Sequence, residues 1–161
     1  MSTSDPHDPS QAADGAATGL ARDGGARPHQ GGCHCGDVRY EAVVEPARAS
    51  RCNCSVCIRL GAATQVVKPD ALTLLVDEAA LASFSRFPEI GSRYFCRRCH
   101  VFVFSRGTLA ELGGAFVSVN LNTLDGFDPG LATFEYWDGR HDNWQAGPRP
   151  APWPVRPAAA G

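Results

Sequence analysis

The 161-residue chain lacks any run of about 18 consecutive apolar residues, which argues against a transmembrane helix. The N-terminal segment MSTSDPHDPSQ carries acidic side chains where a secretory signal carries basic ones, and no apolar stretch follows it. Lysine occurs once, at Lys68, and the formal net charge is −2, so no basic stretch indicates binding to nucleic acid. From these absences we expect a cytoplasmic protein that has neither a membrane nor a nucleic-acid partner.

The distribution of residue types separates one folded part from two tails. Residues 1–30 contain no aromatic side chain and one branched aliphatic side chain, so they bury too little apolar surface to offset the entropy of ordering. Residues 156–161 are rich in Pro and Ala, and we expect them to be loose. The remaining length fits one domain, which we place at residues 31–155.

Within this domain, the spacing of apolar residues predicts strands instead of long helices. Residues 38–44 alternate between apolar and polar side chains, as in a half-buried strand. Pro69 and Asp70 predict a hairpin-like break between two short strands, and residues 78–84 fit one or two helical turns. The other predicted strands lie at residues 64–68, 72–76, 94–95, 101–104, 115–121 and 134–137. The sequence therefore predicts a mostly β domain with few short helices.

Seven cysteines, all within residues 33–99, are the most informative feature of the sequence. An odd number cannot pair completely as intramolecular disulfides. In the cytoplasm thiols stay reduced, and clustered cysteines there more often bind metal or do chemistry. The cysteines form a CxC motif, a CxCxxC motif and a CxxC motif, which are Cys33 and Cys35, then Cys52, Cys54 and Cys57, then Cys96 and Cys99. These spacings predict at least one bound zinc ion.

The three motifs can be divided between metal sites in more than one way. A structural zinc takes four tetrahedral ligands, often as two pairs, and CxC together with CxxC supplies four thiolates. CxCxxC supplies three thiolates, which leaves one position for water or substrate, as in catalytic zinc sites. Spacing alone also allows other divisions, and CxCxxC with one further cysteine would suit an iron–sulfur cluster. Buried cysteines without a metal are the remaining alternative, and the density of the motifs argues against it.

Four short segments follow one another along the chain in a recognisable order. They are GGCHCGDVRY at residues 31–40, CNCSVCIRLG at 52–61, RYFCRRC at 93–99 and VSVNLNTLD at 117–125. Together they resemble the family of glutathione-dependent formaldehyde-activating enzymes, which also includes centromere protein V. The resemblance covers about residues 30–155.

The resemblance implies a fold, two zinc sites and a reaction. The implied fold is a zinc-stabilised β-tent of small antiparallel sheets. The implied activity joins formaldehyde to glutathione as S-hydroxymethylglutathione, which is a carbon–sulfur lyase reaction run in reverse. The implied ligands are Cys33, Cys35, Cys96 and Cys99 for a structural zinc, and Cys52, Cys54 and Cys57 for a catalytic zinc.

Three positions depart from the family pattern. The family usually has Gly after the CxxC motif, where a left-handed backbone suits a tight turn, but this chain has His100. Glu135 stands where the family's final strand often begins with His, and Asn122 stands where Gly is common. These changes leave the cysteines intact and bear on the identity of the substrate.

Several side chains near the CxCxxC motif are candidates for contacts with substrate. Arg59 is expected to bind a carboxylate of the thiol substrate, because Arg recognises carboxylates with two parallel hydrogen bonds. Asn53 and Ser55 are expected to direct an amide and a hydroxyl toward the metal, and stabilisation of the turn is the alternative for both. His141 is expected to have a structural role.

These observations lead to one leading hypothesis and two alternatives. The leading hypothesis is a zinc enzyme that joins a small thiol, glutathione or an analogue, to formaldehyde or a related aldehyde. Metal coordination deprotonates a thiol whose ordinary pKa is about 8.5, and formaldehyde is an electrophile that reacts with a thiolate. The alternatives are a non-catalytic zinc-binding module for protein or nucleic-acid partners, and a zinc–thiolate store or redox sensor. The sequence indicates neither the thiol nor the oligomeric state.

Overall fold

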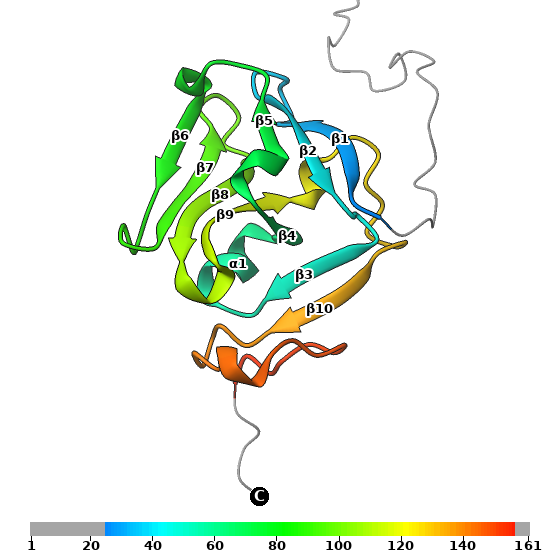
Figure 1. The fold of residues 1–161 in the computed structure, drawn as a ribbon, viewed down its shortest axis with the longest axis vertical. Coiled ribbons are helices and arrows are strands. Elements are labelled where there is room, and N and C mark those ends of the chain that lie inside the picture. The colour runs from blue at the N-terminus through cyan, green and yellow to red at the C-terminus, as the bar shows by residue number, and fades with distance from the viewer. Residues whose placement is uncertain (1–24, 157–161) are drawn as a thin grey trace, which may run out of the picture.

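The computed structural model describes residues 25–156, which form two β-sheets and one short α-helix (Figure 1). The smaller sheet has three antiparallel strands in the order β1-β2-β5. Its strands are β1 (Arg27–Gly32), β2 (Arg39–Val44) and β5 (Leu72–Leu74). The prediction of a mostly β fold with few short helices is confirmed.

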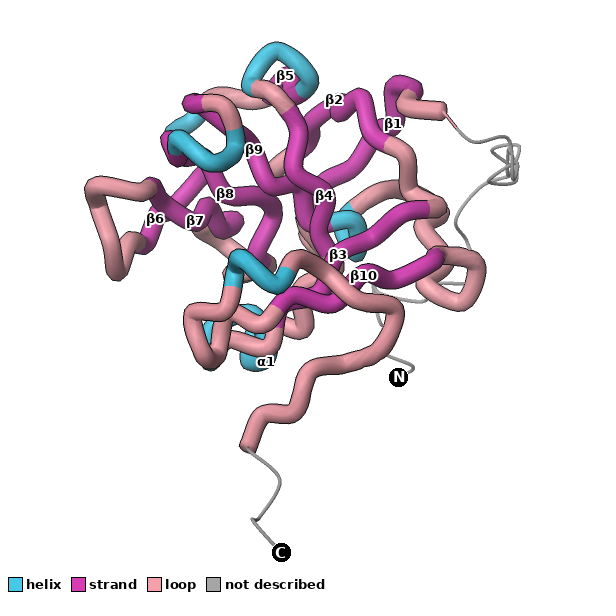
Figure 2. The backbone as a smooth tube through the Cα atoms, turned by 60° about the horizontal axis from the view of Figure 1, so that its bottom comes forward, coloured by secondary structure: helices cyan, strands magenta, loops and turns pink. Residues whose placement is uncertain are grey.

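The larger sheet has seven strands in the order β10-β3-β4-β9-β8-β7-β6. These are β3 (Arg48–Cys52), β4 (Thr64–Val67), β6 (Leu81–Phe84), β7 (Gly91–Cys96), β8 (Phe102–Leu109), β9 (Gly114–Asn120) and β10 (Thr133–Trp137). Neighbouring strands are antiparallel except β3 and β10, which pair in parallel and lie side by side in Figure 2. This one parallel pair departs from the predicted antiparallel sheets.

The helical segments are short and lie between strands. The α-helix α1 (Ser55–Leu60) follows β3 directly. The 3-10 turns are η2 (Pro69–Ala71), η3 (Glu78–Ala80), η4 (Ala110–Leu112), η5 (Leu121–Thr123) and η6 (Trp144–Ala146). In the part of the chain that the structure describes, no helix is long and apolar enough to cross a membrane.

Two predictions about local structure are wrong, and a third is right only in part. Residues 27–30 belong to β1 and not to a disordered tail, because pairing with β2 satisfies their backbone groups, which composition does not reveal. The break at Pro69 and Asp70 is not a hairpin, since β4 and β5 lie in different sheets and η2 connects them. Residues 78–84 form a single 3-10 turn and then β6. The rest of the predicted N-terminal tail lies outside the described residues.

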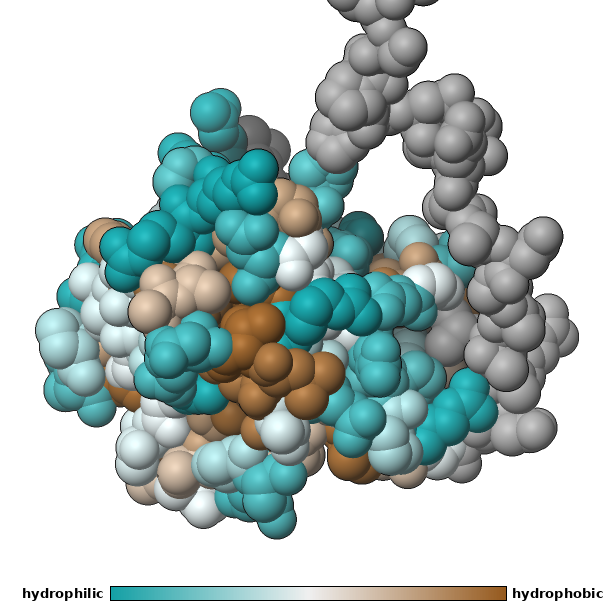
Figure 3. All heavy atoms as spheres, turned by 90° about the horizontal axis from the view of Figure 1, so that it is seen from above, coloured by the Kyte–Doolittle hydropathy of each residue, from teal (hydrophilic) through white to brown (hydrophobic). Residues whose placement is uncertain are grey.

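The core contains side chains from both sheets, and Tyr40 and Phe104 are its largest fully buried residues. The hydroxyl of Tyr40 lies 2.8 Å from Oγ1 of Thr123, so the buried phenol has a polar partner. A Cβ on Gly31 would lie 2.6 Å from Cζ of Tyr40, which explains the glycine at this position. On the surface at the top of Figure 1, apolar side chains gather in a patch among hydrophilic ones (Figure 3).

Because of Tyr40, the free energy of unfolding depends on pH in the alkaline range. Burial disfavours its charged form and raises its pKa to about 12 from an ordinary value of 10. Because the pKa is higher in the folded state, this stabilisation is complete below pH 10 and is lost as pH rises toward 12. We expect the full loss to be about 3 kcal/mol in the free energy of unfolding, of which about two thirds is reached at pH 11.5.

The measurement is urea unfolding at pH 8 and at pH 11.5 for the wild type and for Tyr40→Phe. The variant loses one hydrogen bond, about 1 kcal/mol, at pH 8, and its stability then falls less than that of the wild type as pH rises. If the free energy of unfolding falls equally for both proteins between pH 8 and pH 11.5, ionisation of Tyr40 is not coupled to unfolding.

Candidate metal centres and active site

The CxC and CxxC motifs come together at the turn that joins β7 to β8. All four Sγ atoms lie within 4.8 Å of one another, and Sγ of Cys35 lies 3.5 Å from Sγ of Cys33 and 3.6 Å from Sγ of Cys96. Cys33 and Cys96 are buried. We call this set, Cys33, Cys35, Cys96 and Cys99, the four-thiol cluster.

Backbone hydrogen bonds shape the turn that carries Cys96 and Cys99. The backbone N–H of Cys96 donates to the carbonyl of Val101 at 2.9 Å, and that of His100 donates to the carbonyl of Cys96 at 2.9 Å. The N–H of Cys99 donates to Sγ of Cys96 at 3.4 Å. His100 has a φ of 60°, so it adopts the left-handed conformation that glycine would adopt there. The turn therefore keeps its shape despite the substitution.

His100→Gly should stabilise the protein, because a non-glycine residue in the left-handed region carries strain. Part of the gain is cancelled by the greater freedom of glycine in the unfolded chain, so we expect about 0.5 kcal/mol. The matched variant His100→Ala keeps the strain and removes the polar side chain, and it should not stabilise. Thermal unfolding of the three proteins measures this, and equal midpoints for the Gly and Ala variants would contradict it.

The CxCxxC motif forms a second cluster between β3 and α1. Cys52 ends β3, Cys54 is the N-cap of α1, and Cys57 lies within this helix. The three Sγ atoms lie within 4.8 Å of one another and all three residues are half-buried. The N–H of Cys57 donates to Sγ of Cys54 at 3.5 Å. We call this set, Cys52, Cys54 and Cys57, the three-thiol cluster.

The three thiols are not equivalent. Hydrogen bonds from the thiols of Cys52 and Cys57, with support from backbone N–H groups, hold the pKa of Cys54 far below its ordinary value. The contacts with its two neighbours and burial raise the pKa of Cys57. Cys54 is therefore the thiol that ionises first.

Three or four clustered thiolates are the donor set that zinc prefers, so both clusters can bind metal and both are compatible with zinc.

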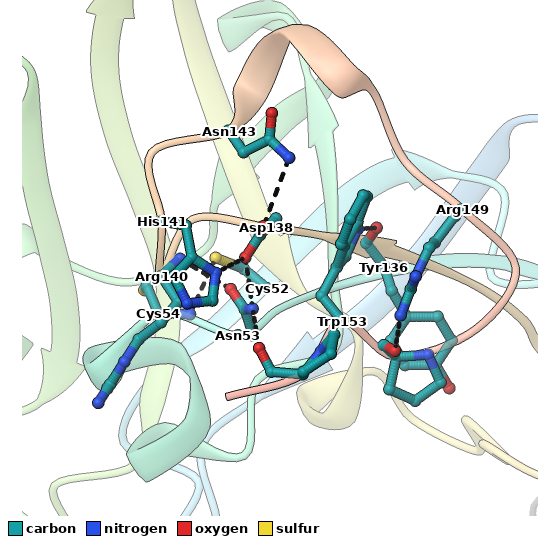
Figure 4. A network of polar contacts seen from close by, with 12 residues as sticks. Cys52, Asn53, Cys54, Tyr136, Asp138, Arg140, His141, Asn143, Arg149 and Trp153 are labelled. Carbon is teal, nitrogen blue, oxygen red and sulfur yellow. Dashed lines mark hydrogen bonds and ion pairs between the residues drawn. The ribbon is translucent and has the colours of Figure 1, made fainter. Parts of the chain in front are cut away.

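The loop that follows β10 holds the three-thiol cluster in place (Figure 4). The side-chain amide of Asn53 donates to Oδ1 of the buried Asp138 at 2.7 Å and accepts from the N–H of Arg140 at 2.8 Å. The N–H of Asn53 donates to the carbonyl of Trp137 at 3.1 Å, which continues the pairing of β3 with β10. Burial would raise the pKa of Asp138, but the hydrogen bonds that it accepts hold the pKa below its ordinary value.

Gly139 brings the backbone of this loop into contact with the cluster. A Cβ at this position would lie 2.6 Å from Sγ of Cys52 and 2.7 Å from Cη2 of Trp144, so a larger residue does not fit. Trp144 is 49% exposed, and its ring centroid lies 6.3 Å from that of Trp137. The half-exposed indole of Trp144 and Sγ of Cys52 thus both border the space that a side chain at position 139 would fill.

The predicted substrate residues take different places. Arg59 is exposed on α1, and its Nη1 donates to the carbonyl of Ser55 at 2.8 Å. Asn53 uses its amide for Asp138, for Arg140 and, at 3.4 Å, for the carbonyl of Pro154, which favours the turn-stabilising alternative. The roles of Arg59 and Ser55 toward substrate stay predictions.

The residues that depart from the family pattern make contacts of their own. Glu135 lies 3.5 Å from Arg48 in an exposed ion pair between β10 and β3. The amide of Asn122 donates to the carbonyl of Gly61 at 2.9 Å, so it ties η5 to the end of α1.

Sequence reasoning missed Asp138 and Gly139, because only the parallel pairing of β10 with β3 places them at the three-thiol cluster.

The fold and the two clusters define a mostly β protein with two candidate metal centres built from cysteine. The chain belongs to the glutathione-dependent formaldehyde-activating enzyme family, whose model matches residues 28–139. This confirms the family resemblance that the sequence motifs indicate.

Two further comparisons find similar proteins. A Halomonas elongata protein named "Putative glutathione-dependent formaldehyde-activating enzyme" is 35% identical over 79 residues, which is 44% of this chain and 50% of that protein. The match thus spans about half the length of this curated relative. The crystal structure of a Rhodobacter sphaeroides protein is similar, with a TM-score of 0.54 and 27% identity over 63% of this chain and 92% of that one.

Proposed function

We propose that this chain is a zinc enzyme that joins a small thiol, glutathione or an analogue, to formaldehyde or a related aldehyde. In this proposal it is a carbon–sulfur lyase of the S-(hydroxymethyl)glutathione synthase type that works in the cytoplasm. The observation that carries the proposal is the three-thiol cluster, which is half-exposed and has three donors, whereas the other cluster has four. Family membership supports the choice of thiol and aldehyde.

The two clusters have different roles in this proposal. The four-thiol cluster would hold a structural zinc, because its four donors complete a tetrahedron and two of them are buried. The three-thiol cluster would hold the catalytic zinc, which when bound stabilises a substrate thiol as its thiolate. The hydrogen bond from Asn53 to Asp138 would hold the turn that carries the three cysteines in shape.

The reaction needs no oxidant or reductant. The thiol sulfur forms a bond to the carbonyl carbon, the π bond of the carbonyl breaks, and the proton of the S–H group ends on oxygen. The product is a hemithioacetal, which is S-hydroxymethylglutathione when glutathione and formaldehyde react. Since this addition also proceeds without a catalyst, the site has to orient the thiolate and carry the proton.

The test combines metal analysis with exchange NMR. We expect two zinc ions per chain, and faster exchange between labelled formaldehyde and its glutathione adduct with the enzyme than without it. A panel of thiols then identifies the substrate. Well under one zinc per chain would overturn the two-site proposal. No acceleration with any thiol would favour a non-catalytic zinc-binding module.

A further inference from the structure

Asp138 and His141 form a hydrogen-bonded pair beside the three-thiol cluster (Figure 4). Nδ1 of His141 lies 2.7 Å from Oδ1 of Asp138. The Asp138 side chain is only 5% exposed, whereas that of His141 is 39% exposed. His141 also lies beyond residues 28–139, the segment that the family model matches. The pair thus joins a buried carboxylate to an imidazole that solvent and small molecules can reach.

The carboxylate of Asp138 fixes the orientation of the imidazole. It accepts hydrogen bonds from the amides of Asn53 at 2.7 Å and Asn143 at 3.5 Å, so it is held from two sides. An ionised carboxylate only accepts, and therefore Nδ1 of His141 carries the proton in their shared hydrogen bond. In the neutral ring Nε2 then has a free lone pair. A buried Asp that sets the tautomer of a His is the arrangement that serine hydrolases use to prepare a base.

The same loop places His141 at the three-thiol cluster. A Cβ on Gly139 would lie 2.6 Å from Sγ of Cys52, and the N–H of Arg140 donates to Asn53, so residues 138–141 run along the turn that carries the three-thiol cluster. Figure 4 shows the imidazole on the side of this loop where Cys52 and Cys54 lie. Among the described residues, the ligand atoms that lie within 4.8 Å of one another here are the three sulfurs alone. The imidazole therefore stands outside the set of metal donors.

We propose that His141, oriented by Asp138, is the proton-transfer residue of the thiol–aldehyde reaction, an inference that rests on the proposed function. Nε2 accepts the proton of the substrate S–H group as the thiolate forms, and the sulfur then bonds to the carbonyl carbon. It then returns this proton to the carbonyl oxygen, whose π bond to carbon has broken. The imidazole ends neutral, no atom is oxidised or reduced, and Asp138 acts as a positioning residue.

The activity test compares His141→Gln and Asp138→Asn with the wild type. Gln keeps a polar contact to Asp138 but cannot carry the proton, so we expect kcat/KM to fall about 100-fold. Asn at position 138 no longer enforces the tautomer, and we expect a fall of at least about tenfold. Asp70→Asn, at an exposed position in η2 outside both clusters, is the matched control and should keep the wild-type rate. Zinc content and the unfolding midpoint of each variant show whether it is folded.

Chemical rescue separates proton transfer from a structural role. His141→Gly leaves space for added imidazole, which should restore part of the lost rate in this variant and give no acceleration of the wild type. A purely structural His141 would show no rescue. Nitrogen NMR of labelled histidine gives a readout besides activity, with a protonated Nδ1 in the wild type and a changed tautomer population in Asp138→Asn.

The outcomes distinguish this inference from the proposed function. If the wild type does not accelerate the exchange, both are overturned. If the wild type is active and His141→Gln keeps its kcat/KM with unchanged zinc content, the proton-transfer role is wrong and the proposed function stands. A large loss with rescue by imidazole and the expected tautomer supports both.

Discussion

Cys99→Ser should yield a chain that no longer folds stably at room temperature. In the proposed structural site the residue supplies one of four thiolates, and a hydroxyl does not replace a thiolate as a zinc ligand. Binding of structural zinc contributes about 10 kcal/mol or more in small metal domains, which is comparable to the whole stability of a typical domain. Cys99 is only half-buried, so lost packing would explain little of the effect. Circular dichroism and zinc content of the purified variant measure the result.

The same test includes removal of the metal from the wild type. A strong chelator should unfold the wild type, and added zinc should refold it but should not refold Cys99→Ser. If the variant keeps the wild-type spectrum and unfolding midpoint, the four-thiol cluster does not hold a structural metal.

Cys54→Ser should abolish catalysed exchange and leave the fold intact. Serine is a good N-cap residue, so its hydroxyl can accept the hydrogen bond from the N–H of Cys57 and α1 is preserved. The variant loses the thiol that ionises first in the three-thiol cluster, and with it a ligand of the proposed catalytic zinc. We expect the exchange rate to fall to the uncatalysed rate, zinc to fall toward one per chain, and the unfolding free energy to change by less than about 2 kcal/mol.

The two cysteine variants are matched, because each replaces one half-buried sulfur by oxygen. If one cluster is structural and the other catalytic, the two variants should give opposite results. Cys99→Ser should lose the fold, and Cys54→Ser should lose the activity. Equal effects on fold and zinc content would show that the metal sites are not divided between the clusters in this way.

Local patterns in the sequence predict much of this fold. Alternation at residues 38–44 and 115–121 identifies β2 and β9, because each strand buries one face. The CxxC motif between two apolar runs identifies the turn between β7 and β8. What alternation does not show is which strands pair. The assignment of β4 and β5 to different sheets depends on contacts with β2 and β9, which are distant in sequence.

The candidate site was predictable only in part for the same reason. Cysteine spacing indicates two groups of thiols, and the structure brings together the sets of four and three that the family resemblance implies. Asp138 is different, because it belongs to no motif and reaches Asn53 only through the parallel pairing of β10 with β3. A contact between residues 85 positions apart leaves no local signal in one sequence.

The parallel pairing of β3 with β10 also sets an order of assembly. Proteins are made from the N-terminus, and contacts between residues that are close in sequence form sooner than distant ones. The four-thiol cluster is complete once residue 99 has left the ribosome. The three sulfurs of the other cluster emerge earlier, but the loop that holds them comes from residues 138–144, after β10 has joined β3. During synthesis, therefore, the proposed structural metal can bind before the proposed catalytic centre has its final shape.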